Sequence, residues 1–168
     1  MSKGRAPDPA AASFISIIMN PIVAILPESR VLLGLEAGSK KRVLEEAGQL
    51  FETTAGIDHA LVFDTLLTRE KLGSTGLGQG VAIPHSRIKG LDGAVGAFIR
   101  MAEPLDFDAP DGKPVSLVFV LLAPEQDAEA SLQILALLAT AFAEQTFRES
   151  LAAAPDAAAV LALFANAG

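Results

Sequence analysis

The apolar residues in the first half of this chain recur with helical spacing, and each such segment starts at a capping residue. Ser39 precedes a segment of about sixteen residues with one apolar and one charged face, which predicts an amphipathic covering helix. Asp58 precedes a second helical segment, which Gly73 ends. Asn20 and Pro21 begin a short helix over 22–26. The inward positions predicted for the second helix are Leu61, Val62, Thr65, Leu66 and Leu72.

Apolar runs of strand length lie between and after these helices. The runs 31–35, 94–101 and 115–122 are predicted strands, and the last is a central strand because it is apolar throughout. Turn residues at 109–112 make a hairpin of the last two runs. A shorter buried strand, 81–83, ends at Pro84, and the chain is predicted to turn again at Lys89 and Gly90.

The C-terminal part of the chain is predicted to form two helices. From Asp127 to Gln145 the segment is apolar nearly all round, which predicts a helix packed between two partners. A final helix is capped at Asp156 and runs through Phe164. This order of elements predicts an α/β fold, a single-domain sandwich in which a mixed sheet of about five strands carries helices on both faces.

Composition and charge narrow the function classes. The 168 residues suffice for one domain, 19–168, preceded by a predicted flexible leader over 1–18 with Met19 as an alternative start. Without cysteine there is no disulfide or thiolate nucleophile, and two histidines argue against a zinc site. We therefore expect a cytoplasmic protein with no metal and no cofactor. The net charge of −7 opposes nucleic-acid binding and suits a basic protein partner.

The apolar run over 10–26 is the one stretch that could suggest membrane targeting. Lys3 and Arg5 precede it, as in a secretory signal. Asn20 and Pro21 interrupt the run, however, and no convincing cleavage site of small residues follows. It is also too short to span a bilayer, so we expect a soluble protein with no membrane insertion.

The candidate chemistry lies between Leu72 and Arg87, where four glycines within 73–80 precede a short strand and then His85. Glycines tolerate positive φ and allow backbone N–H groups to converge on an anion. Pro84 restricts the backbone on both sides, so that the histidine is held in place. The spacing is neither a dinucleotide fingerprint nor a Walker loop. The alternatives are a plain tight turn and a histidine that only satisfies a backbone hydrogen bond.

The run GSTGLGQGVAIPHSR resembles the phosphorylation-site motif of the enzyme IIA family of the bacterial sugar phosphotransferase system, fructose/mannitol type, and most of all its nitrogen-regulatory branch. The resemblance covers roughly residues 21–164 and implies the same α/β architecture. It implies that His85 accepts a phosphoryl group through Nε2 from the phosphohistidine of an HPr-type phosphocarrier. The other ring nitrogen should then be held by a backbone carbonyl. Regulatory target proteins and a homodimer are further partners that the sequence leaves open.

The resemblance and the chemistry of anion binding together select the site residues. Arg69 lies where the family carries an arginine beside the phosphorylated histidine, and a guanidinium pairs well with phosphate. The alternative is that Arg69 is only a solvated residue at the end of a helix. Arg87 and Lys89 are weaker candidates, and His59 is expected to have no role. The predicted phosphate-binding residues are Arg69, Thr75, Gly78, Gly80, Ser86 and Ser131.

Ser131 departs from the family, many members of which carry a second histidine at this position. A serine hydroxyl can donate one hydrogen bond to phosphate, but it cannot share a proton or charge with His85. The chain should therefore accept phosphate more readily than it passes phosphate on.

Three functions are compatible with the motif. The first is a phosphoryl-accepting regulator of the nitrogen-type phosphotransferase branch. The second is a sugar-specific enzyme IIA that relays phosphate to an enzyme IIB; the form of the loop and the lack of a fused carrier or membrane domain argue against it. The third is a metal-dependent hydrolase using His85, the weakest because no second histidine has suitable spacing. Whether the chain acts as an enzyme or only as a regulator is left open.

Overall fold

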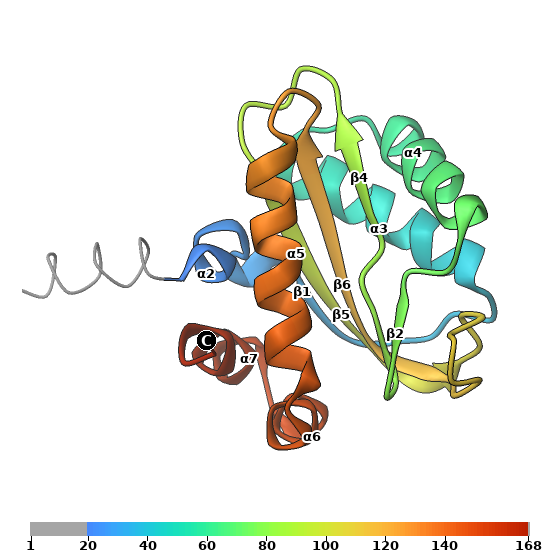
Figure 1. Ribbon diagram of the computed structural model, residues 1–168, viewed down its shortest axis with the longest axis vertical. Helices are drawn as coiled ribbons and strands as arrows, with labels where there is room; N and C mark the ends of the chain where they lie inside the picture. Colours follow the sequence, from blue (N-terminus) through green and yellow to red (C-terminus); the bar gives the residue numbers. More distant parts are fainter. Residues whose placement is uncertain (1–19, 168) are drawn as a thin grey trace, which may run out of the picture.

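The computed structural model describes residues 20–167, which form a six-stranded mixed sheet between two layers of helices (Figure 1). The hairpin strands β5 (Val95–Leu105) and β6 (Val115–Pro124) are antiparallel and central, and β1 (Val31–Leu35) runs parallel to β5. On the other edge of β6 lie β3 (Val81–Ala82) and β4 (His85–Ile88), both parallel to it, and β2 (Gly76–Gly78) is antiparallel to β3. The predicted α/β sandwich is confirmed, with six strands instead of five.

Helices cover both faces of the sheet (Figure 1). One face carries α3 (Lys40–Ala55) and α4 (His59–Leu72). The other carries α2 (Pro21–Ile25), α5 (Ala128–Ala143), α6 (Gln145–Ala153) and α7 (Ala157–Ala165). A short 3-10 turn, η1 (Glu28–Arg30), leads into β1. The predicted N-caps are confirmed, because a side-chain oxygen of each accepts a backbone N–H of the first turn: Asn20, Ser39, Asp58, Asp127 and Asp156.

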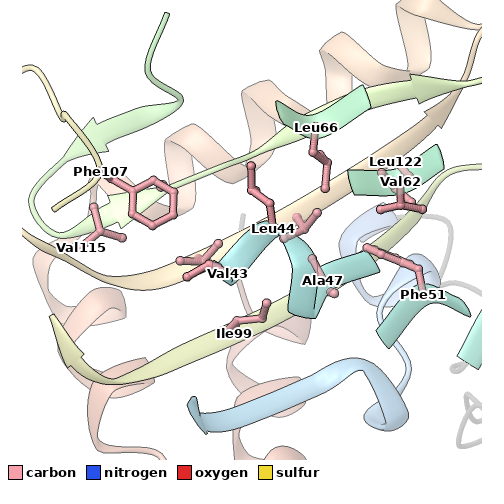
Figure 2. Packing of buried hydrophobic residues seen from close by; sticks show 14 of the residues in the cluster. Val43, Leu44, Ala47, Phe51, Val62, Leu66, Ile99, Phe107, Val115 and Leu122 are labelled. Carbon is pink, nitrogen blue, oxygen red and sulfur yellow. The ribbon is translucent and has the colours of Figure 1, made fainter. Parts of the chain in front are cut away.

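The core consists of two apolar layers that share the central strand β6. Successive residues of a strand point to opposite faces, so Val118, Val120 and Leu122 pack toward α3 and α4. Figure 2 shows this layer, in which Val43, Leu44 and Phe51 of α3 lie over the sheet. The residues Leu117, Phe119 and Leu121 face the other layer, where Phe164 contacts several aromatic rings edge-on. The strand with which β4 pairs, β6, therefore contributes side chains to the core on both of its faces.

The short strand predicted to end at Pro84 is present as β3, and a second strand, β4, begins directly after the proline. β3 pairs with Leu117 and Val118 of β6, and after Ile83 and Pro84 the chain resumes the same parallel pairing as β4. The Pro84 carbonyl accepts the N–H of Leu121 at 3.0 Å, so the interruption stays attached to β6. His85 is the first residue of the resumed strand and lies beside Leu121.

The helix predicted over Asp127–Gln145 is present as the slightly shorter α5, but its predicted packing between two partners is wrong. The chain leaves the helical conformation at Glu144, and α5 and α6 are bent by 87° at that point. Arg148 of α6 donates to the carbonyls of Phe142 and Ala143, so a side chain of the next helix caps the last turn of α5. α5 also buries one face only, since Leu132 is 63% exposed.

The inward face predicted for the second helix is correct in part. Val62 and Leu66 of α4 are fully buried, whereas Leu61 is exposed and Leu72 is 81% exposed. The strand predicted over 94–101 continues to Leu105. The predicted leader, 1–18, lies outside the described residues.

The length and apolar character of the helices also bear on membrane spanning. Among residues 20–167, no single helix is both long and apolar enough to cross a membrane; α5 and α6 reach that length only as a pair with a sharp bend.

Candidate phosphorylation site

A pocket of about 460 Å³ opens beside β4, at the edge of the sheet. α4 borders it on one face of the sheet and α5 on the other, so the pocket lies where both helical layers meet the strand edge. It brings together four of the predicted site residues, His85, Arg69, Ser86 and Ser131. The lining residues are Asp64, Thr65, Thr68, Arg69, Leu72, His85, Ser86, Arg87, Ser131, Leu132 and Leu135.

His85 is oriented by a hydrogen bond to the backbone two residues before it. Its Nδ1 lies 2.7 Å from the Ile83 carbonyl oxygen. A carbonyl oxygen can only accept, so Nδ1 carries the proton and Nε2 keeps a free lone pair. The expectation that a backbone carbonyl holds the other ring nitrogen is confirmed. The half-buried imidazole is therefore prepared to act as a nucleophile through Nε2.

Burial lowers the pKa of His85 from its ordinary value of 6.5, because a charged ring would be poorly solvated there. The nearby positive charge of Arg69 lowers this pKa further. The Ile83 carbonyl and the negative charge of Glu70 act in the opposite direction without outweighing burial. At neutral pH the ring is consequently in its neutral, nucleophilic form.

Three more predicted residues line the pocket around His85. Arg69 donates to the Gly73 carbonyl at 3.0 Å, which occupies one of the five N–H groups of its guanidinium. Ser86 is hydrogen-bonded through its hydroxyl to Thr65 at 3.0 Å. Ser131 lies in the first turn of α5 and is 7% exposed, at the wall of the pocket. Arg87 is exposed at the rim, while Lys89 is not part of the lining.

Gly78 and Gly80 lie outside this pocket, in the turn between β2 and β3. Both have positive φ, as predicted for glycine, and so does Gln79 between them. An anion does bind at this turn, but it is the chain's own Asp111, whose carboxylate accepts the Gln79 N–H at 2.8 Å. The glycines thus form a tight hairpin turn, which differs from the predicted phosphate cradle.

Thr75 also differs from its predicted role. Its hydroxyl donates to Glu70 Oε2 at 2.6 Å and its backbone N–H to Glu70 Oε1 at 3.0 Å. A hydroxyl has a single proton, so Thr75 has none left to donate to a phosphoryl group.

Sequence reasoning did not single out Glu70. Its side chain is only 2% exposed and forms an ion pair with Lys40 Nζ at 3.3 Å. The sequence carries no local signal for this burial, because the partner Lys40 belongs to another helix, α3.

His59 lies elsewhere, at the start of α4. Its Nδ1 is 2.7 Å from Glu52 Oε2, and that carboxylate raises the pKa of His59. Within residues 20–167, one group of acidic and histidine side chains is close enough to share an ion, namely Glu52, Asp58 and His59, all exposed. This group does not include His85, so it gives no support to the hydrolase hypothesis.

Comparison with known proteins decides the family. The profile described as "Phosphoenolpyruvate-dependent sugar phosphotransferase system, EIIA 2" matches residues 24–167. The chain belongs to this enzyme IIA family. The family predicted from the motif around His85 is thereby confirmed, and the match covers most of the described residues 20–167.

The relatives of this enzyme IIA domain also indicate its branch. It is 43% identical to a nitrogen regulatory protein of Pseudomonas aeruginosa, over 81% of the chain and 89% of that protein. A nitrogen regulatory protein of Bradyrhizobium diazoefficiens is 39% identical over 86% of the chain and 95% of its own length. The crystal structure of nitrogen regulatory protein IIA-Ntr from Neisseria meningitidis superposes with a TM-score of 0.82 at 54% identity, covering 86% of the chain and 99% of that structure. The predicted nitrogen-regulatory branch is confirmed.

The two histidines should titrate on opposite sides of 6.5, His85 below and His59 above. Between its folded pKa and 6.5, unfolded His85 binds more protons than folded His85, so the stability of the fold should decrease as pH falls through that window. An NMR titration of the imidazole nitrogens measures both pKa values, with His59→Gln to assign the signals. A pKa of His85 above 6.5 would contradict the burial argument.

Proposed function

We propose that this enzyme IIA domain is a phosphoryl-accepting regulator, phosphorylated on His85 Nε2 by the phosphohistidine of an HPr-type phosphocarrier. The observation that carries the proposal is the hydrogen bond from His85 Nδ1 to the Ile83 carbonyl, which leaves the Nε2 lone pair free to attack phosphorus. The Nε2–P bond forms as the N–P bond of the donor breaks. The donor imidazole keeps the electron pair of that bond and takes up a proton from solvent, while His85 keeps its own proton on Nδ1.

The groups around His85 suit this transfer. The ring of His85 gains positive charge when Nε2 bonds to phosphorus, and the Ile83 carbonyl stabilises that charge through the Nδ1 proton. Arg69 provides a planar guanidinium for the phosphoryl oxygens. The hydroxyl of Ser131 is a further donor at the same wall. Ser86 also lines the pocket, but its proton is directed at Thr65, whose own hydroxyl donates to a carbonyl of its helix. No metal or cofactor enters this scheme.

The rim of the pocket favours a protein as the donor. Leu72 on α4 is 81% exposed and Leu132 on α5 is 63% exposed, and the two lie on either side of the site. Exposed apolar side chains that gather around one site mark a protein contact surface more often than scattered ones do. A carrier that presents its own phosphohistidine could bury both leucines while the two imidazoles approach.

The sugar-specific alternative is less favoured by the relatives. A "PTS system fructose-specific EIIA component" of Haloferax volcanii is 40% identical, but over 56% of the chain, whereas the nitrogen regulatory relatives match over more of it. The mannitol enzyme IIA of Escherichia coli shares the fold, with a TM-score of 0.71 at 24% identity. We therefore place signalling through protein partners ahead of relay to an enzyme IIB.

Incubation with phosphoenolpyruvate and the general phosphotransferase proteins should add one acid-labile phosphoryl group to the chain. His85→Ala should abolish the addition, because it removes the nucleophile, and His59→Ala should leave it unchanged. Intact-mass measurement detects the product. Phosphate on the His85→Ala protein, or its loss from the His59→Ala protein, would overturn the assignment.

Arg69→Ala should slow phosphorylation by roughly ten- to a hundredfold, since a hydrogen bond to a charged group contributes about 1.5 to 3 kcal/mol. Arg69→Lys should recover part of the rate, because an ammonium keeps the charge without the bidentate fork. Rapid-quench assays give the rates, and urea denaturation should show both variants within about 0.5 kcal/mol of the wild type. A variant that is phosphorylated normally but unfolds several kcal/mol more easily would make Arg69 a structural residue.

Ser131→His should speed the return of phosphate to the carrier, because an imidazole can share a proton and charge with His85 where a hydroxyl cannot. The rate at which the chain accepts phosphate should change less than the rate of return, because one neutral hydrogen bond contributes only about 0.5 to 1.5 kcal/mol. Exchange of labelled phosphate with the carrier measures both directions. Equal exchange rates for the wild type and the variant would contradict the idea that Ser131 makes the chain a slow switch.

A further inference from the structure

Glu70 is a buried carboxylate that no step of the proposed transfer uses. Its two oxygens accept three hydrogen bonds, from Lys40 Nζ at 3.3 Å, the Thr75 N–H at 3.0 Å and the Thr75 hydroxyl at 2.6 Å. Removing a carboxylate from water is costly, and an apolar side chain could fill the same space without that cost. Packing alone therefore does not explain why the residue is acidic.

The contacts of Glu70 continue directly to the reactive histidine. Thr75, held at two points by the carboxylate, accepts the Ile83 N–H through its own carbonyl at 3.0 Å. The carbonyl of Ile83 in turn accepts the Nδ1 proton of His85 at 2.7 Å. Each of these hydrogen bonds is directional. A shift of Thr75 therefore moves Ile83, and the Ile83 carbonyl determines which ring nitrogen of His85 carries the proton.

Lys40 anchors the far end of this connection. Its ammonium group lies between Glu70 and Asp108, at 3.3 Å and 3.1 Å, and 5.8 Å from the ring centroid of Phe107. The carboxylate is thus fixed from α3, which belongs to the core, while its other contacts lead to the strand edge. This arrangement couples the orientation of His85 to a rigid part of the fold.

We propose that Glu70 is a positioning residue for phosphoryl acceptance, which fixes Thr75 and thereby holds the Ile83 carbonyl on Nδ1 of His85. The proposal rests on the proposed function of His85. It makes two separable statements: the hydrogen bonds of Glu70 set the tautomer of the ring, and the charge of Glu70 influences how readily the ring is protonated.

Two substitutions separate these effects. Glu70→Gln removes the charge but can still accept the Thr75 N–H, so the Nδ1-protonated tautomer should persist while the pKa of His85 falls. Glu70→Ala removes both, so the ring should become a mixture of tautomers and phosphorylation should slow by about tenfold, the value of one hydrogen bond of about 1.4 kcal/mol. Glu70→Gln should recover most of that rate.

Imidazole ¹⁵N NMR gives the tautomer and pKa without any phosphorylation, and rapid-quench assays give the rate. Arg100→Gln is the matched control, because Arg100 also anchors backbone carbonyls, those of Leu151 and Ala154, but on the opposite face of the sheet. It should move neither readout. If Glu70→Ala does not fold, Thr75→Val removes only the hydroxyl bond and should shift the tautomer in the same direction.

The proposal would be overturned if Glu70→Ala left both the tautomer of His85 and the phosphorylation rate unchanged. If Glu70→Ala does not fold, the same result in Thr75→Val would overturn it. A change of the same size in Arg100→Gln would also overturn it, since the effect would then be one of general stability. If the wild type accepts no phosphate at all, the function proposed for His85 fails. The NMR measurement still decides whether Glu70 orients the ring.

Discussion

The hydrogen bond between His85 Nδ1 and the Ile83 carbonyl is the contact on which the site depends. It joins residues on either side of Pro84, so the rigid proline ring fixes the geometry that the bond requires. The backbone around it is secured on both sides, because Ile83 donates to Thr75 and the Pro84 carbonyl accepts from Leu121 of β6. His85 is therefore oriented by main-chain groups attached to the centre of the sheet. In the proposed transfer, the side chains of the pocket need only bind the phosphoryl group.

Features that depend on neighbouring residues could be predicted from the sequence. The caps Ser39, Asp58 and Asn20 act within three residues, and each begins a helix where expected. The held position of His85 also follows from its neighbours, since Pro84 limits the backbone on both sides. Arg69 was located by the family motif, and the structure places it in the lining of the same pocket.

Features that depend on distant segments could not be predicted in this way. α5 ends at Glu144 without a glycine or proline, and its last turn packs through Phe142 against Phe164 of α7. The burial of Glu70 requires Lys40 from another helix. The glycine turn faces Asp111, a residue far along the chain, which occupies the N–H group that was expected to meet phosphate. In each case a partner remote in sequence decides between two locally acceptable arrangements.

The position of His85 on β4 has a consequence for aggregation. Among the described strands β4 pairs only with β6, so its other edge carries backbone groups that could template a strand from another molecule. That edge is only four residues long, and the proline before it offers no N–H, so an added strand would find an interrupted ladder. α4 and α5 border it on both faces. The sheet can thus carry His85 at its margin while remaining a poor template for cross-β association.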